Sequence, residues 1–341
     1  MNLISVFRFV GSKEEIELLK IKIKNEEREV SKFILLHNTV RYDGNEYEDS
    51  DLGFIDNDPF FENYKDRIII SKSAVTTSAD ANEYNHKIIT GNRPIELILK
   101  NKETRLLNAA RNHVCSAYNL LKRLKSIEES VILISDLDES VDFSNKDKNI
   151  RLCNSIDRQR RVNRPCRILR HKFEFDFDNS WPEHTYKPKS EIDTRWIYCI
   201  PWKIVKATEG KILWDVRGQI VDPILDSKFS LAFEYTSCLS KQLLQTKLKY
   251  IEHANYIDRI QLEYFLKLNI KLSCKYFEEM AEFMNFINKD AMGLHKIVEL
   301  DENTSSEYVI ANIQRLKTWL IPDNYEEFRT RFRLALNKST V

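Results

Sequence analysis

Glycine is scarce in this chain of 341 residues, which contains only seven of them. Neither G-x-x-x-x-G-K nor G-x-G-x-x-G occurs, so the glycine-rich loops that surround a phosphate in P-loop and dinucleotide-binding proteins are not expected. The six cysteines form no C-x-x-C pair, which argues against a zinc knuckle or a redox pair. Scattered cysteines of this kind favour reduced, buried thiols in a cytoplasmic protein.

An excess of charge of one sign is also lacking. Lys and Arg together number 53 and Asp and Glu 52, so the net charge is +1 and gives no overall attraction to nucleic acid or to an anionic membrane. No apolar run reaches transmembrane length, and the N-terminus shows no signal-peptide pattern. We therefore expect a cytoplasmic protein without a transmembrane segment.

Strand and helix patterns alternate over the first part of the chain. Strands are expected over residues 3–10, 33–36 and 67–71 and from residue 131, and helices over about 12–25 and 103–125. The acidic residues 43–62 and the polar residues 72–94 are predicted to be loops. This alternation predicts an α/β fold with a mostly parallel, twisted sheet and helices on both faces.

Beyond residue 150 the pattern first favours strands and then helices. The strand patterns cover residues 166–178, 195–206 and 228–235. The helical patterns cover residues 239–252, 256–268, 273–287, 306–320 and 324–336. We predict one large domain over residues 1–255 and a helical extension over residues 256–341.

Residues 131–140, Val-Ile-Leu-Ile-Ser-Asp-Leu-Asp-Glu-Ser, say most about function. A buried strand is followed by Asp136 and Asp138, and a strand's period of two would turn both side chains to one side. Two carboxylates suit Mg²⁺ or Mn²⁺ carrying a substrate phosphate, and ligands of open α/β sheets gather at the carboxyl ends of strands. The segment predicts the metal–diphosphate site of a nucleotide-sugar enzyme; an acidic turn after a core strand is the alternative.

Several motifs, taken in chain order, carry a resemblance to one enzyme family. They are the aromatic strand with Phe7 and Phe9, Glu17-Leu18-Leu19 with Ile21-Lys22, Lys32-Phe33-Ile34-Leu35, Thr39 and Gly44, Ala110-Arg111-Asn112, Ser135-Asp136-Leu137-Asp138-Glu139, Phe173-Glu174-Phe175-Asp176-Phe177, Arg195-Trp196 and Lys249-Tyr250-Ile251-Glu252-His253. Over about residues 1–260 this set resembles the β-1,4-mannosyl-glycoprotein β-1,4-N-acetylglucosaminyltransferase family, glycosyltransferase family seventeen. The resemblance implies a GT-A-like fold, a UDP-sugar or related nucleotide-sugar donor, a divalent metal, and inverting transfer to a glycan or other hydroxyl acceptor.

The sequence departs from the family pattern at three places. Leu231-Ala232-Phe233 stands where the family has Trp-His-Phe, and Asn255 stands where it has Glu. Ser140-Val141 follows Glu139 in place of the expected proline. The acceptor and the catalytic base are therefore not carried over from the family.

The predicted metal ligands are Asp136 and Asp138, with His253 as a third through its neutral imidazole. The cofactor would be Mn²⁺ or Mg²⁺, which would offset the charge developing on a departing nucleoside diphosphate. Glu139 is a candidate base or outer acid. It would face away from Asp136 if the strand continued, but a turn could bring it in; a solvated turn residue is the alternative.

Two arginines are candidates for the donor site beside Asp136. Arg111 lies close to the apolar stripe of its predicted helix, where a guanidinium could clamp a diphosphate; a structural ion pair, for example with Asp136, is the alternative. Arg217 precedes Gly218, and a positive charge near a glycine turn suits a phosphate or an acceptor.

A basic run over residues 158–172 is the one strong local cluster of charge. Within it, Arg160 and Arg161 are the candidates for binding an acceptor, which could be anionic. A solvated face is the alternative. A nucleic-acid acceptor has no support from the net charge or from aromatic residues within the run.

Two further functions fit the same acidic motif. In a haloacid-dehalogenase-like phosphatase, Asp136 would be the nucleophile and Asp138 the general acid and base. That motif normally opens a chain, whereas three predicted strands precede it here, and a downstream paired-Asp motif is missing. A non-catalytic binding protein on a transferase fold is the other alternative, because the family's His and Glu are absent.

Overall fold

The computed structural model describes residues 1–9, 11, 15–37, 52–72, 114–115, 117–168, 171–174, 179–180, 197–216, 224–225, 232–236, 296–297, 300–301 and 305–320. The chain forms two compact units. The first comprises Met1–Arg170 with Ser190–Ala232, and the second His171–Lys189 with Phe233–Val341. Most of the predicted helical extension, residues 256–341, lies outside the described residues.

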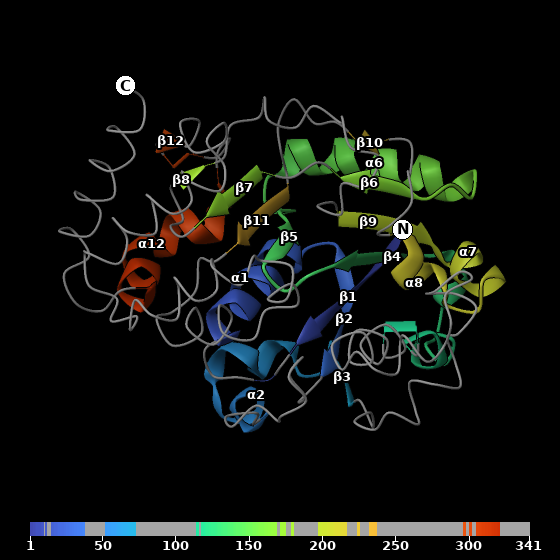
Figure 1. Cartoon of the computed structure of the whole chain (residues 1–341), viewed down its shortest axis with the longest axis horizontal. Coiled ribbons are helices and arrows are strands. Elements are labelled where there is room, and N and C mark those ends of the chain that lie inside the picture. The colour runs from blue at the N-terminus through green and yellow to red at the C-terminus, as the bar shows by residue number, and fades with distance from the viewer. Residues whose placement is uncertain are drawn as a thin grey trace, which may run out of the picture. The chain divides into compact units, whose positions relative to one another are not determined.

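A seven-stranded sheet forms the core of the first unit (Figure 1). Its strands are β1 Asn2–Phe9, β2 Val30–His37, β3 Ile68–Lys72, β4 Ser130–Ser135, β6 Cys166–Ile168, β9 Ile197–Pro201 and β10 Ile224–Leu225. They lie in the order β10-β6-β9-β4-β1-β2-β3. Strands β3, β2, β1 and β4 are parallel, β9 is antiparallel to β4 and β6, and β10 is parallel to β6. The predicted α/β fold with a mostly parallel sheet is confirmed.

Both faces of this sheet are apolar, as expected for central parallel strands. On one face, Val6 of β1 lies beside Ile34 of β2 and Ile134 of β4 in a buried cluster. Helices α7 Trp202–Ala207 and α8 Ile212–Asp215 contribute to this cluster. On the other face, Phe7 lies under α1 Ile16–Glu26, with the Lys22 ammonium 4.8 Å from its ring centroid. Packed groups therefore cover both faces of the sheet, so a polar ligand would have to bind at the ends of its strands.

The structure corrects the sequence-based assignment in three segments. The predicted loop at 43–62 includes α2 Gly53–Asn57 and the 3₁₀ helix η2 Pro59–Tyr64, which Asp58 caps by accepting from the Phe60 N–H. The predicted strand 195–206 ends at Pro201, and α7 follows. Helix α6 Lys146–Arg161 was not predicted. Its apolar stripe is thin, because only Leu152 and Ile156 are buried apolar residues on it.

The second unit contains the strand order β12-β8-β7-β11. The bounds are β7 His171–Glu174, β8 Asn179–Ser180, β11 Ala232–Thr236 and β12 Lys296–Ile297, Ala232 itself being assigned to the first unit. Helix α12 Glu307–Leu320 matches the predicted helix 306–320. Within the described ranges, no helix has both the length and the apolar character needed to cross a membrane.

Candidate functional site

The candidate site lies where the strand order reverses. The chain passes from β1 through α1 to β2 on one side of β1, and it returns later to β4 on the other side. In open α/β sheets such a reversal leaves a crevice outside the carboxyl ends of the two diverging strands, and ligands bind there. Phe7 of β1 is paired with Ser135 of β4, so Arg8 and Asp136 follow at the same edge.

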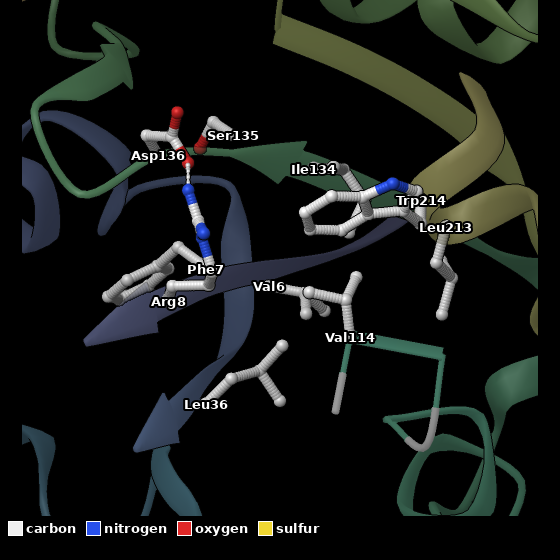
Figure 2. Close-up of a pocket in the computed structure, with 10 residues that line it drawn as sticks. All are labelled: Val6, Phe7, Arg8, Leu36, Val114, Ile134, Ser135, Asp136, Leu213 and Trp214. Atoms are coloured by element: carbon white, nitrogen blue, oxygen red, sulfur yellow. Dashed lines mark hydrogen bonds and ion pairs between the residues drawn. The ribbon is translucent and has the colours of Figure 1, made fainter. Parts of the chain in front are cut away.

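A small pocket opens at this edge (Figure 2). Its polar lining includes Arg8, Ser135 and Asp136, and Trp214 of α8 lies on the opposite side. The apolar lining includes Val6, Leu36, Val114, Ile134 and Leu213. Its volume of about 10 Å³ corresponds to about one water molecule. A ligand of nucleotide size would therefore lie across the mouth of the pocket, against its polar residues, and not inside it.

Arg8 forms an ion pair with the first aspartate of the acidic motif. Its Nη2 lies 3.4 Å from Asp136 Oδ1, and the two side chains are 28% and 29% exposed. The guanidinium carbon also lies 5.7 Å from the ring centroid of Trp214, within cation–π range. The ion pair is longer than the 2.7–2.9 Å of a tight charge-assisted hydrogen bond. Sequence reasoning missed Arg8, although a charged residue between Phe7 and Phe9 at the end of an apolar strand is a usable signal.

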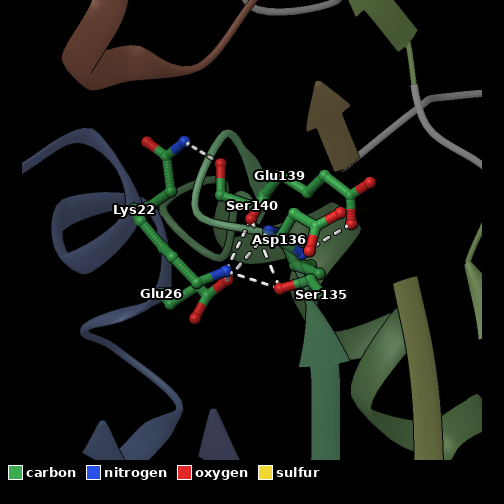
Figure 3. A network of polar contacts seen from close by, with 8 residues as sticks. Lys22, Glu26, Ser135, Asp136, Glu139 and Ser140 are labelled. Atoms are coloured by element: carbon green, nitrogen blue, oxygen red, sulfur yellow. Dashed lines mark hydrogen bonds and ion pairs between the residues drawn. The ribbon is translucent and has the colours of Figure 1, made fainter. Parts of the chain in front are cut away.

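The acidic motif forms a closed turn after β4. The strand ends at Ser135, and the Glu139 N–H donates to the Asp136 carbonyl oxygen at 3.2 Å. In return, the Asp136 N–H donates to Glu139 Oε2 at 2.9 Å (Figure 3). The strand alternation used to predict the orientation of Asp136 and Asp138 therefore does not extend to these positions. The turn brings in Glu139, which is only 3% exposed, and its carboxylate holds the turn. Its role as a base stays a prediction.

A buried lysine fastens this turn to helix α1 (Figure 3). The Lys22 side chain is fully buried, and its Nζ donates to Glu26 Oε1 at 3.0 Å, to Ser135 Oγ at 2.7 Å and to the Glu139 carbonyl oxygen. Glu26 Oε1 also accepts from the Val141 N–H at 3.4 Å. The residues on either side of the two aspartates are thus held by one ammonium group.

Asn25 adds a second connection between α1 and the segment after the turn. Its side-chain amide donates to Ser140 Oγ at 2.8 Å, and its backbone carbonyl oxygen accepts from the Phe143 N–H at 2.7 Å. Strand β5 Glu139–Val141 is consequently held against α1. The acidic turn therefore has a fixed place at the edge of the sheet.

Asp136 and Asp138 are the carboxylates of this turn that could hold a cation. Within the ranges that the structure covers, no cluster of three or more Asp, Glu, His or Cys side chains is arranged to hold a metal ion. Asp136 and Asp138 supply two carboxylates from a single turn. Mg²⁺ is commonly held by one or two carboxylates, with substrate phosphates and water completing its shell. A cation held by these two carboxylates would need phosphate oxygens or water to complete its shell.

Among the other predicted site residues, the structure describes only Arg160 and Arg161. Arg111, Arg217 and His253 lie outside the described residues. Arg160, at the end of α6, pairs with Asp157 at 2.8 Å and with Glu129; Arg161 pairs with Asp157 at 2.7 Å.

The ion pair with Glu129 places Arg160 at the opposite edge of the sheet. Glu129 immediately precedes β4, whereas Asp136 immediately follows it. A strand of six residues separates such positions by about 20 Å. An acceptor that contacts both Arg160 and the acidic turn must span this distance. Acceptor binding by Arg160 and Arg161 stays a prediction.

Replacing Arg160 by alanine is expected to cost less than about 1 kcal/mol of unfolding free energy, because its ion pairs are at the surface. The hydrogen bond from Arg160 lowers the pKa of Asp157, so this contribution is present at neutral pH and is lost as the pH falls below the carboxyl's ordinary 3.8. Urea unfolding at pH 7 and at pH 3 measures it. Loss of donor turnover in this variant would contradict the placement of Arg160 away from the site.

Comparisons of the chain with protein-family models, with curated proteins and with solved structures found no match. The resemblance to glycosyltransferase family seventeen stays a prediction, and the geometry of the edge at β1 and β4 supports the functional proposal.

Proposed function

We propose that this protein is a metal-dependent glycosyltransferase with a GT-A-like fold, which moves a sugar from a nucleoside-diphosphate donor, a UDP-sugar, to a hydroxyl acceptor. One observation supports this most strongly: the Asp136–Glu139 turn lies at the carboxyl end of β4, beside the end of β1, where the strand order reverses. This is the edge at which α/β sheets bind nucleotides.

In the proposed reaction, Asp136 and Asp138 hold Mn²⁺ or Mg²⁺. When bound, the metal neutralises negative charge that develops on the departing nucleoside diphosphate. Glu139 and Lys22 act as positioning residues, because their hydrogen bonds hold the Asp136 N–H, the Ser135 hydroxyl and the Glu139 carbonyl group. A carboxylate base removes the proton of the acceptor hydroxyl, and single displacement inverts the anomeric configuration.

A panel of nucleotide sugars, tested with and without Mn²⁺, examines the proposal. A ligand that binds only the folded state at 100 times its Kd adds about 2.7 kcal/mol of stability, so the correct donor should raise the melting temperature by several degrees. The rise should disappear in EDTA. The donor that gives it should also be hydrolysed or transferred, with inversion visible by proton NMR.

Three results of the nucleotide-sugar experiment would contradict the proposed function. No stabilisation by any nucleotide sugar in the presence of Mn²⁺ would reject it. Metal-dependent release of phosphate from p-nitrophenyl phosphate, without donor binding, would favour the phosphatase alternative. Binding of a donor without turnover under any acceptor condition would favour a non-catalytic binding protein.

A further inference from the structure

We infer that Arg8 is a switching cation of this site: it neutralises Asp136 while no metal is bound, and it binds the diphosphate once a metal has taken Asp136. The inference rests on the proposed function. It adds a residue that binds the diphosphate of the donor, and it gives a reason for the metal and the diphosphate to bind together.

The position of Arg8 favours this role. It follows Phe7 at the carboxyl end of β1, opposite the end of β4, and its guanidinium reaches Asp136 Oδ1 across the mouth of the pocket. At 28% exposure the side chain is partly open to solvent. Trp214 provides an aromatic face 5.7 Å from the guanidinium carbon. An aromatic face attracts the guanidinium whether or not it is paired with the carboxylate, so the charge stays at the mouth.

A metal and Arg8 compete for the same carboxylate. The guanidinium nitrogen lies 3.4 Å from Oδ1 of Asp136, and a metal held by this carboxylate would lie beside it. Two cations this close to one oxygen repel each other. Metal binding therefore weakens the hold of Asp136 on Arg8.

A diphosphate would give both cations, the metal and Arg8, an anionic partner. Its oxygens match the fork of a guanidinium in a bidentate arrangement, and they also coordinate the metal. Arg8 then exchanges one anionic partner for another, and Asp136 exchanges Arg8 for the metal. Metal alone has to displace Arg8 without compensation, whereas metal with diphosphate does not.

The test measures two affinities in Arg8→Gln, which removes the charge but keeps a polar side chain. The probes are Mn²⁺ alone and Mn²⁺ with inorganic pyrophosphate, and free Mn²⁺ is quantified by electron paramagnetic resonance. We expect Mn²⁺ alone to bind about two- to fivefold more tightly than in the wild type, since a partly exposed ion pair is removed. We expect Mn²⁺-pyrophosphate to bind about 10- to 100-fold more weakly, since hydrogen bonds from a charged group are lost.

Two further variants serve as controls. Arg8→Lys keeps the charge but not the fork, so it should bind Mn²⁺ alone as the wild type does and still lose affinity for pyrophosphate. Arg123→Gln removes an exposed charge elsewhere in the first unit and should change neither affinity. Circular dichroism spectra and melting curves establish that each variant is folded.

The opposite signs of the two effects separate this role from a structural one. If Arg8→Gln weakened both affinities or changed neither, or if the wild type did not bind Mn²⁺-pyrophosphate, the inference would be wrong. Turnover of a nucleotide sugar with unchanged affinities in Arg8→Gln would reject the inference and leave the proposed function standing. If the two affinities shifted in opposite directions but no donor was turned over, the proposed function would be rejected and the inference about Arg8 would stand.

Discussion

Replacement of Lys22 by methionine is expected to lower the free energy of unfolding by about 3–5 kcal/mol, the range measured when one partner of a buried ion pair is removed. Lys22 is 0% exposed and Glu26 1%, so neither charge is solvated. Methionine matches the shape of the lysine stem but donates no hydrogen bonds. It would leave Glu26, Ser135 and the Glu139 carbonyl group without their shared donor.

Two comparisons make this expectation specific. Lys24→Met, on the same helix, removes a pair with Glu27 in which both side chains are about one-third exposed, and it should cost less than about 1 kcal/mol. The double replacement Lys22→Met with Glu26→Leu removes both buried charges and should be more stable than Lys22→Met alone. Urea unfolding of the wild type, Lys22→Met, Glu26→Leu and the double variant gives the interaction energy of the pair.

The lysine also has an expected effect on the site. At temperatures where Lys22→Met is still folded, the acidic turn has lost its anchor, so its affinity for Mn²⁺ with a nucleoside diphosphate should fall. A loss of less than 1 kcal/mol in stability, together with unchanged ligand affinity, would show that the network does not hold the turn.

Asp138→Asn is expected to lower kcat/KM for sugar transfer by at least about 10²–10³-fold, the size of effect seen when one group that stabilises developing charge is removed. The amide is nearly the same shape as the carboxylate but has no charge to offset that of a metal. Asp138 is partly exposed in its turn, so the change in stability should be small. Kinetics at saturating Mn²⁺ and a melting curve measure the two quantities.

A matched variant tests whether replacing any acidic residue of the first unit would also lower kcat/KM. Asp147→Asn changes an exposed carboxylate in the first turn of α6 and should leave transfer unchanged. Wild-type turnover by Asp138→Asn, or full activity of the native protein in a chelator, would show that this carboxylate does not hold a catalytic metal.

The strands next to β1 were predictable because each is a nearly continuous apolar run. The same property placed Asp136 and Asp138 at a strand end. The geometry beyond Ser135 was not predictable, because the turn is closed by a carboxylate and a backbone N–H whose pairing is visible only in three dimensions. Trp202 and Val205 are β-formers by composition, yet they lie in α7, since burial against the sheet outweighs their local preference.

The charged groups of the site were the hardest to predict. Lys22 falls on the buried side of its helix, where a lysine is normally absent, and its partners lie 113 and 117 residues further along the chain. Arg8 and Asp136 are separated by 128 residues. Hydrophobic periodicity is read over short windows of sequence, so it cannot predict contacts between residues this far apart.

These long separations have a consequence for the order of events during synthesis. Helix α1 and the first strands leave the ribosome well before Ser135, and until then the ammonium of Lys22 can pair locally only with Glu26. Closing a loop of more than a hundred residues is slow compared with forming a helix, so the acidic turn takes its place after α1, β1 and β2 have formed. A nascent chain that ends before Val141 has no anchored turn, so the proposed binding of a metal would begin only once β4 has docked beside β1.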